Sequence, residues 1–148
     1  MSLKTKALHA LMRKVMEEHI AFNKLLGLKV ESFDTESPKL RFDMRPELVG
    51  NPTRQILHGG VISATLDVAG GFAIMLALAA DMTGIPTSFP NMGTIDLRVD
   101  YLRPGRGKHF VATARIVRKG SRIAVTHMEL NNDEGELIAT GGAAYVIG

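Results

Sequence analysis

The chain has 148 residues, of which 45% are hydrophobic and 22% are charged. This composition is typical of one globular domain over residues 1–148 and excludes a disordered or fibrous chain. The chain has no cysteine, which excludes a disulfide framework, a thiolate metal site and a cysteine nucleophile, and its net charge of +3 is only mildly basic.

The first predicted element is an amphipathic N-terminal helix. Its apolar residues recur at helical spacing, namely Leu8, Leu11, Met12, Val15, Phe22, Leu25 and Leu26. Gly27 follows them and is expected to end the helix. The segment has neither the long apolar run nor the cleavage site of a signal peptide, so we expect a cytoplasmic protein.

Two strands and a loop come next. Residues 28–33 and 39–44 are predicted as strands, the second because its apolar residues alternate cleanly. Residues 45–57 contain two prolines and a glycine and are predicted as a loop.

A second helix is predicted over about Gly59–Ala80. From Val61 to Ala80 it is almost entirely apolar, and Asp67 is its only charge. Such a length could cross a bilayer, but the glycines, the hydroxyl residues and the carboxylate favour a fully buried helix in the centre of a globular domain.

The remaining residues predict a loop and four strands. The loop is at 81–91, and the strands are at 93–102, 110–117, 123–130 and 137–146. The element order predicts an α+β fold, in which a six-stranded antiparallel sheet wraps around one long buried helix with an extra N-terminal helix.

The positive charge is concentrated in one segment. Residues Arg98–Arg122 contain eight basic residues and one acidic residue, which gives +7, while the rest contains 10 basic and 14 acidic residues, which gives −4. This segment suggests an anionic partner such as nucleic acid, a membrane surface or a phosphorylated small molecule. The alternative is that it carries only solvated surface cations.

The start of the apolar helix carries the candidate chemistry. His58 precedes Gly59 and Gly60, and free amides at a helix start can bind an anion or a developing oxyanion. Asp67 lies seven residues after Gly60, on the same helix face, where a carboxylate could act as general base or nucleophile. The alternative is an Asp that caps a loop or pairs with an arginine.

Other catalytic and cofactor motifs are absent from the sequence. It contains no serine-hydrolase elbow, phosphate loop or dinucleotide fingerprint, and its five histidines lack metal-ligand spacing. The sequence therefore predicts no cofactor and no metal site. Few aromatic residues interleave with the basic segment, which argues against nucleic acid as a partner.

Two stretches carry a family resemblance. His58–Asp67, with the sequence HGGVISATLD, and Gly93–Gly105, with the sequence GTIDLRVDYLRPG, resemble the hotdog-fold acyl-CoA thioesterases of the PaaI type. Within them, the chain is most similar to the YigI-like branch of medium- to long-chain acyl-CoA thioesterases. The resemblance covers Gly50 to the C-terminus well and the first helix loosely.

The resemblance implies a role for each matching residue. Asp67 would attack the thioester or activate water, and the amide of Gly59, which His58 precedes, would polarise the thioester carbonyl. Asn51 would help to hold the nucleophile or the water, and Thr94 would complete the site from the neighbouring subunit. The expected CoA contacts are Tyr101, Arg103, Arg106, Lys119, Gly120, Ser121 and Arg122.

The resemblance also implies partners. The substrate would be an acyl-CoA, and the chain would form a homodimer or a homotetramer built as a dimer of dimers, with each site shared between subunits. The loop at 81–91 follows the catalytic helix and is expected to shape the acyl pocket. Neither nucleic acid nor membrane is expected as a partner.

Three other functions stay open from the sequence. The first is a non-catalytic acyl-CoA binding or sensing module on the same fold, in which Asp67 is structural. The second is a dehydratase or hydratase that acts on acyl thioesters, although the residue pair expected for it is missing. The third is a nucleic-acid binder that uses the basic segment.

Overall fold

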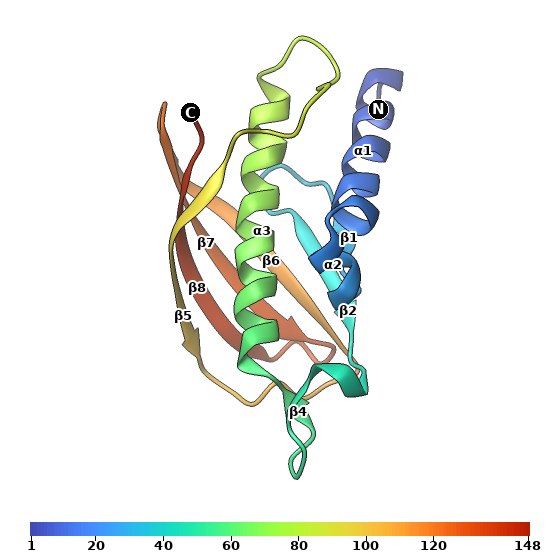
Figure 1. Ribbon diagram of the computed structural model, residues 1–148, viewed down its shortest axis with the longest axis vertical. Helices are drawn as coiled ribbons and strands as arrows, with labels where there is room; N and C mark the ends of the chain where they lie inside the picture. The colour runs from blue at the N-terminus through green and yellow to red at the C-terminus, as the bar shows by residue number, and fades with distance from the viewer.

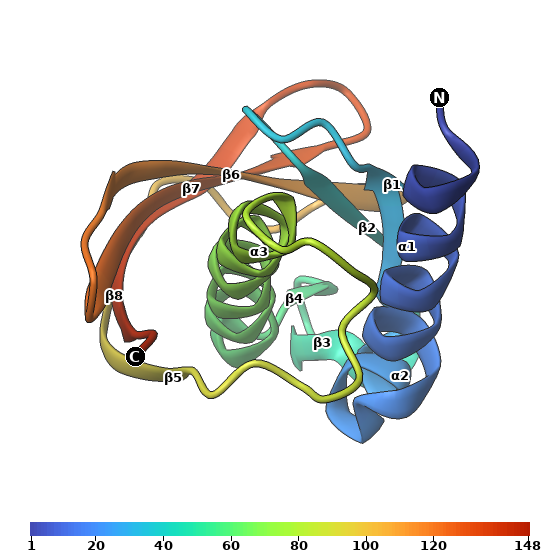
Figure 2. The same ribbon diagram turned by 90° about the horizontal axis from the view of Figure 1, so that it is seen from above.

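The computed structural model describes residues 1–148, in which a curved sheet packs against one side of a long helix (Figure 1). The sheet consists of β1 (Lys29–Ser32), β2 (Lys39–Asp43), β5 (Gly93–Tyr101), β6 (His109–Lys119), β7 (Ile123–Asn132) and β8 (Leu137–Val146). All neighbouring strands are antiparallel, in the order β1-β2-β6-β7-β8-β5, and α3 (Gly59–Ala80) packs against the concave face (Figure 2). The predicted α+β fold is therefore confirmed.

The N-terminal helix is interrupted. It consists of α1 (Leu3–Lys14), a π-helical turn (Val15–His19) and α2 (Ala21–Leu26), and the backbone is extended at Ile20. The prediction of one continuous helix is wrong at this point, because no glycine or proline marks the break in the sequence. The predicted end is confirmed, since Gly27 has a φ of 74° and terminates α2 in the left-handed conformation that glycine favours.

The segment predicted as a loop at 45–57 contains structure of its own. A 3₁₀ turn (Pro46–Leu48) leads into a hairpin of two short strands, β3 (Val49–Asn51) and β4 (Ile56–Leu57). Gly50 allows this hairpin to lie against the start of α3, because a Cβ at this position would lie 2.4 Å from the Cα of His58. The hairpin therefore positions His58, the residue that precedes the first turn of α3.

The connection between β5 and β6 also passes the start of α3. β5 pairs with β8 at the sheet edge instead of with β6, so residues 102–108 must pass the ends of β8 and β7 to reach β6. On the way, the Leu57 amide donates to the Gly105 carbonyl at 3.0 Å. A Cβ at Gly105 would lie 2.7 Å from the Cβ of Leu57, so this close crossing requires glycine.

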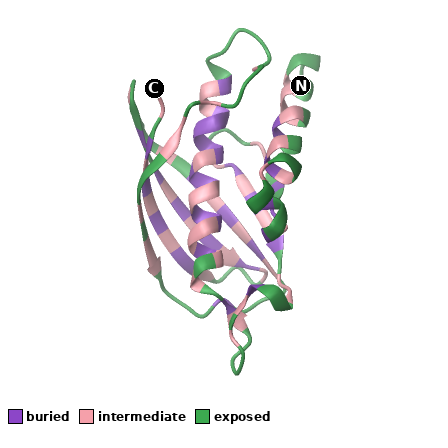
Figure 3. Ribbon diagram, viewed as in Figure 1, coloured by how far each residue is buried: buried purple, intermediate pink, exposed green.

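α3 is the core helix of the fold. It is long and apolar enough to span a bilayer, but most of its apolar residues are buried against the sheet. The expectation of a fully buried helix is wrong, because the sheet curls around only part of it (Figure 3). One face stays exposed or half-buried along its length, and its members include Gly60, Ser63, Asp67, Gly71 and Leu78.

Candidate active site

The start of α3 presents one free backbone amide. His58 caps the helix, and its Nδ1 accepts a hydrogen bond from the Gly60 amide at 2.7 Å. The His58 amide in turn donates to the Leu48 carbonyl at 2.8 Å, which holds the cap in place. The Gly59 amide has no acceptor within the protein and lies at the positive end of the helix dipole. It is therefore available to an oxyanion or a carbonyl oxygen.

Asp67 lies two turns further along α3 and is half-buried. The Thr94 hydroxyl donates to Asp67 Oδ1 at 2.8 Å, and the Tyr145 hydroxyl lies 3.2 Å from the same oxygen and 2.7 Å from the Asp67 carbonyl oxygen. Oδ2 has no partner in the protein, and Asp67 forms no ion pair. The alternative of an arginine-bound Asp is therefore wrong, and one carboxylate oxygen is held while the other is free.

The sheet brings both hydroxyl groups to Asp67. Thr94 on β5 and Tyr145 on β8 are direct cross-strand partners, and a bulge follows Thr94 in the β5 ladder. Gly70 makes room for the tyrosine, because a Cβ at this position would lie 2.4 Å from the Tyr145 hydroxyl oxygen. Thr94 and Asp67 are thus already bonded within one chain, and the expectation that Thr94 completes the site of the neighbouring subunit stays a prediction.

Tyr145 is the site residue that the sequence analysis missed. Its side chain is buried, and burial, reinforced by the negative charge of Asp67, raises the pKa of its phenol well above the ordinary value. The hydroxyl therefore keeps its proton at neutral pH and acts as a hydrogen-bond donor. The signal in the sequence was its inward-facing position in the predicted strand 137–146.

Gly59 and Asp67 of one chain are too far apart to act on the same atom. They are separated by eight residues of α-helix, and at about 1.5 Å per residue this places them roughly 12 Å apart along the axis. Reacting groups must approach to about 3–3.5 Å, so a carbonyl bound at Gly59 lies out of reach of Asp67 in the same chain. The two groups can meet only if a second copy places its α3 alongside.

Asn51 does not approach Asp67. Its side-chain oxygen accepts hydrogen bonds from the amides of Thr53 at 3.1 Å and Arg54 at 3.0 Å, which closes the turn between β3 and β4. The role expected for Asn51, to hold the nucleophile beside Asp67, is therefore not supported within one chain. Asn51 lies next to Gly50, which packs on His58, and so belongs with the helix start.

The basic segment divides into two separate regions. The turn at residues 101–106 lies at the start of α3, where the Tyr101 hydroxyl donates to the Gly59 carbonyl at 3.1 Å and Arg106 donates to the Arg54 carbonyl at 3.0 Å. The turn at residues 119–122 lies at the other end of the helix, where Lys119 pairs with Asp81 at 3.1 Å (Figure 1). The expected CoA contacts therefore lie in two separate places within one chain, and their role in CoA binding stays a prediction.

Comparisons with known proteins agree on the family to which the chain belongs. Residues 54–139 match the model of the Thioesterase superfamily. The chain is 43% identical over 138 residues to the medium/long-chain acyl-CoA thioesterase YigI of Escherichia coli strain K12, with coverage of 88% of this chain and 87% of YigI.

Solved structures agree with this result. A Shewanella oneidensis protein related to the thioesterase superfamily aligns with a TM-score of 0.86 and 40% identity, over 99% of this chain and 98% of that one. Escherichia coli PaaI, a protein of the phenylacetic acid degradation operon, aligns with a TM-score of 0.78, over 99% of this chain and 96% of that one. At 22% identity, PaaI supports the fold alone.

Proposed function

The chain belongs to the thioesterase superfamily and is a thioester hydrolase, and from this premise we propose that it hydrolyses medium- to long-chain fatty acyl-CoA to fatty acid and CoA. The observation that carries the proposal is the state of Asp67, whose Oδ1 is held by Thr94 and Tyr145 while Oδ2 is free. A carboxylate fixed by one oxygen can present the other to water or to a carbonyl carbon. The cytoplasmic location stays a prediction.

In the proposed mechanism, the acyl-CoA carbonyl oxygen accepts a hydrogen bond from the free Gly59 amide. Asp67 Oδ2 either removes a proton from the attacking water, or attacks the carbonyl carbon and forms a mixed anhydride that water then hydrolyses. In both routes the C–S bond breaks, the CoA thiolate leaves and takes up a proton, and the fatty acid is released. The amide stabilises the charge that develops on the carbonyl oxygen, because it points at that atom from the positive end of α3. His58 precedes this amide and would shape its surroundings, and Asn51 follows Gly50, which packs on His58.

The roughly 12 Å between Gly59 and Asp67 supports a site shared by two copies. We propose that Asp67 and Thr94 of one copy face the helix start of the other across a two-fold axis. β5 forms one edge of the sheet and has unpaired backbone groups, and its exposed Ile95 offers apolar surface to a partner. A dimer, or a dimer of dimers, through this edge would complete both sites.

CoA binding is expected to depend on the basic turn beside Gly59. Replacing both Arg103 and Arg106 with alanine is expected to weaken CoA binding about tenfold, because exposed arginines near the carbonyl site can contact its phosphates. The same replacement of Lys119 and Arg122 serves as the matched control, and a smaller effect is expected because Lys119 is paired with Asp81. Calorimetry at two salt concentrations measures both affinities. An unchanged affinity for CoA in the Arg103 and Arg106 variant would show that this turn does not contribute to CoA binding.

Tyr145 is expected to position Asp67. Tyr145→Phe removes one donor from the carboxylate, so we expect kcat to fall about tenfold with little change in KM. Steady-state kinetics measures kcat and KM, and a thermal melt verifies the fold. An unchanged kcat, or a loss that follows the melting temperature, would indicate a structural role only.

A hydrolysis panel tests the proposed function directly. The full-length protein is incubated with hexanoyl-, decanoyl-, myristoyl- and palmitoyl-CoA, and the released thiol is measured. We expect turnover that is fastest with the medium and long chains. If CoA esters bind but none is hydrolysed, the chain is the non-catalytic acyl-CoA binding module instead.

A further inference from the structure

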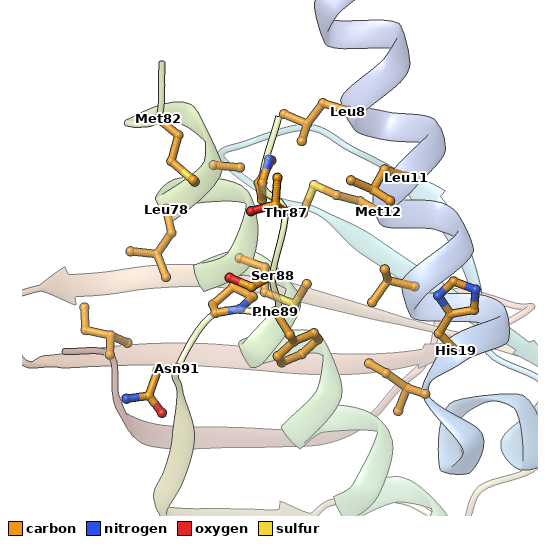
Figure 4. Close-up of a pocket in the computed structure, with 17 residues that line it drawn as sticks. Leu8, Leu11, Met12, His19, Leu78, Met82, Thr87, Ser88, Phe89 and Asn91 are labelled. Atoms are coloured by element: carbon orange, nitrogen blue, oxygen red, sulfur yellow. The ribbon is translucent and has the colours of Figure 1, made fainter. Parts of the chain in front are cut away.

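A large cavity lies between α1 and the C-terminal half of α3. Its volume is about 740 Å³, and residues of the loop that follows α3 cross over it (Figure 4). Figure 4 shows Leu8, Leu11 and Met12 on the α1 side and Leu78 on the α3 side, with Phe89 of the loop between them. No part of the mechanism described above uses this space.

The chemistry of the lining favours an apolar ligand. Most of the residues around the cavity are hydrophobic, and the only ionisable side chain among them is His19. No lysine or arginine lines the space, so it offers nothing to hold the phosphates of a nucleotide. The apolar face of α1 therefore lines a cavity whose chemistry suits a hydrocarbon chain.

The cavity is lined by residues of α3 that lie on the same side of the helix as Asp67. Gly71 and Met75 follow the aspartate at helical spacing, and Leu78 continues the same side of the helix. Gly71 has no side chain to obstruct this path, and a Cβ there would only reach van der Waals contact with Met92, at 3.6 Å. A chain that starts at the carboxylate can thus run along the helix into the cavity.

The length of this path can be compared with a fatty acyl chain. Met75 and Leu78 lie about 12 Å and about 16 Å beyond Asp67 along the axis. Carbon–carbon bonds of about 1.5 Å at tetrahedral angles extend a chain by roughly 1.25 Å per carbon, so about 10 carbons reach Met75 and about 13 reach Leu78. A hexanoyl chain ends before the cavity begins.

From these observations we propose that the cavity between α1 and α3 holds the distal half of the substrate's acyl chain and sets the chain-length preference. The inference rests on the proposed acyl-CoA hydrolysis, and it assigns the selection of long chains to α1 and to the loop at 81–91. Lys4 of α1 donates to the Thr83 carbonyl at 2.9 Å, which fastens that loop to the same helix. This hydrogen bond therefore links α1 to the loop at 81–91, the two segments to which the selection of long chains is assigned.

The test fills the cavity from the α1 side. Leu11→Trp enlarges a half-buried lining residue, and Leu3→Trp is the matched control, because Leu3 is 84% exposed on the same helix and does not line the cavity. Leu78→Phe narrows the space from the opposite wall and carries the test if Leu11→Trp lowers the melting temperature. Each full-length variant is assayed with hexanoyl-, decanoyl- and palmitoyl-CoA.

We expect kcat/KM for palmitoyl-CoA to fall about tenfold or more in Leu11→Trp. A loss of this size corresponds to about two methylene groups of the acyl chain that are no longer buried in the cavity. The value for hexanoyl-CoA should change less than about twofold, and Leu3→Trp should match the unmodified protein at every length. An equal loss at all lengths, or no loss with palmitoyl-CoA, overturns the proposal. The proposal is also overturned if Leu11→Trp changes the oligomeric state but not the chain-length preference, because this result would indicate that a second copy of the chain fills the cavity.

A binding measurement separates this proposal from the proposed function. In the Asp67→Asn background, palmitoyl-CoA should bind more tightly than CoA alone, and Leu11→Trp should remove that advantage while Leu3→Trp keeps it. If this pattern holds but the unmodified protein hydrolyses no acyl-CoA, the cavity assignment stands and the proposed activity fails. If hydrolysis occurs but the pattern is absent, the cavity assignment alone fails.

Discussion

Replacing Asp67 with alanine is expected to abolish thioester hydrolysis and to leave CoA binding largely intact. Asp67 supplies the only free carboxylate oxygen in the site, and loss of a general base or nucleophile costs about 100- to 10,000-fold in rate. Its position on the accessible face of α3 indicates that the side chain is not needed to hold the core together. Thiol release measures turnover, and calorimetry with CoA measures binding.

Asp67→Asn is the finer variant, because its amide oxygen can accept the same hydrogen bonds from Thr94 and Tyr145. The geometry is kept while the basic oxygen is lost, so we expect kcat to fall about 1,000-fold with a nearly unchanged melting temperature. Asp43→Asn, an exposed carboxylate on β2, is the control and should retain full activity. Retained turnover in Asp67→Ala would remove Asp67 from the mechanism.

Gly59→Pro is expected to remove the amide without disturbing the helix. Gly59 is the first residue of α3, where proline is tolerated, and the extended backbone of His58 suits a residue that precedes proline. Loss of one oxyanion donor lowers kcat by about 100- to 1,000-fold. Gly59→Ala is the matched control, because it adds a Cβ near Tyr101 but keeps the amide, and it should stay within about threefold of the original rate.

The same variants test whether two chains share the site. Neither Gly59→Pro nor Asp67→Ala should be active alone, but a mixed pair has one intact site, made of Gly59 from one copy and Asp67 from the other. After subunit exchange, statistical mixing in a two-fold dimer restores about one quarter of the original activity. If both groups acted within one chain, every site in the mixture would lack one of them, and no activity would return.

The fold could be predicted largely because its signals are local. The alternating strands and the apolar helix Gly59–Ala80 are visible as periodicity, and each was found close to its observed bounds. The break at Ile20 and the hairpin β3–β4 were missed, because neither follows a periodic pattern. The exposed face of α3 was missed for another reason, since how far a sheet curls around a helix depends on the whole assembly of strands.

The candidate site was predicted only in part. Asp67 and Gly59 stood out by residue type and position, but the helical face that they share concealed their separation along the axis. Tyr145 could not be identified as a partner of Asp67 without the strand order, because β8 had to be placed beside β5 first. The split of the basic segment likewise depended on the course of β6, whose 11 residues run between the two basic turns.

The position of α1 has a consequence for how such enzymes could diverge. The helix that forms one wall of the cavity precedes residues 54–139, the region that matches the family, whereas Asp67 and Gly59 lie inside that region. One wall of the proposed acyl site would then be encoded apart from the reactive groups, whereas the loop at 81–91 and the α3 wall lie inside the matched region. Exchange of the first 27 residues between relatives should therefore shift the chain-length preference in part and leave the catalytic centre unaltered, so specificity could change without loss of activity.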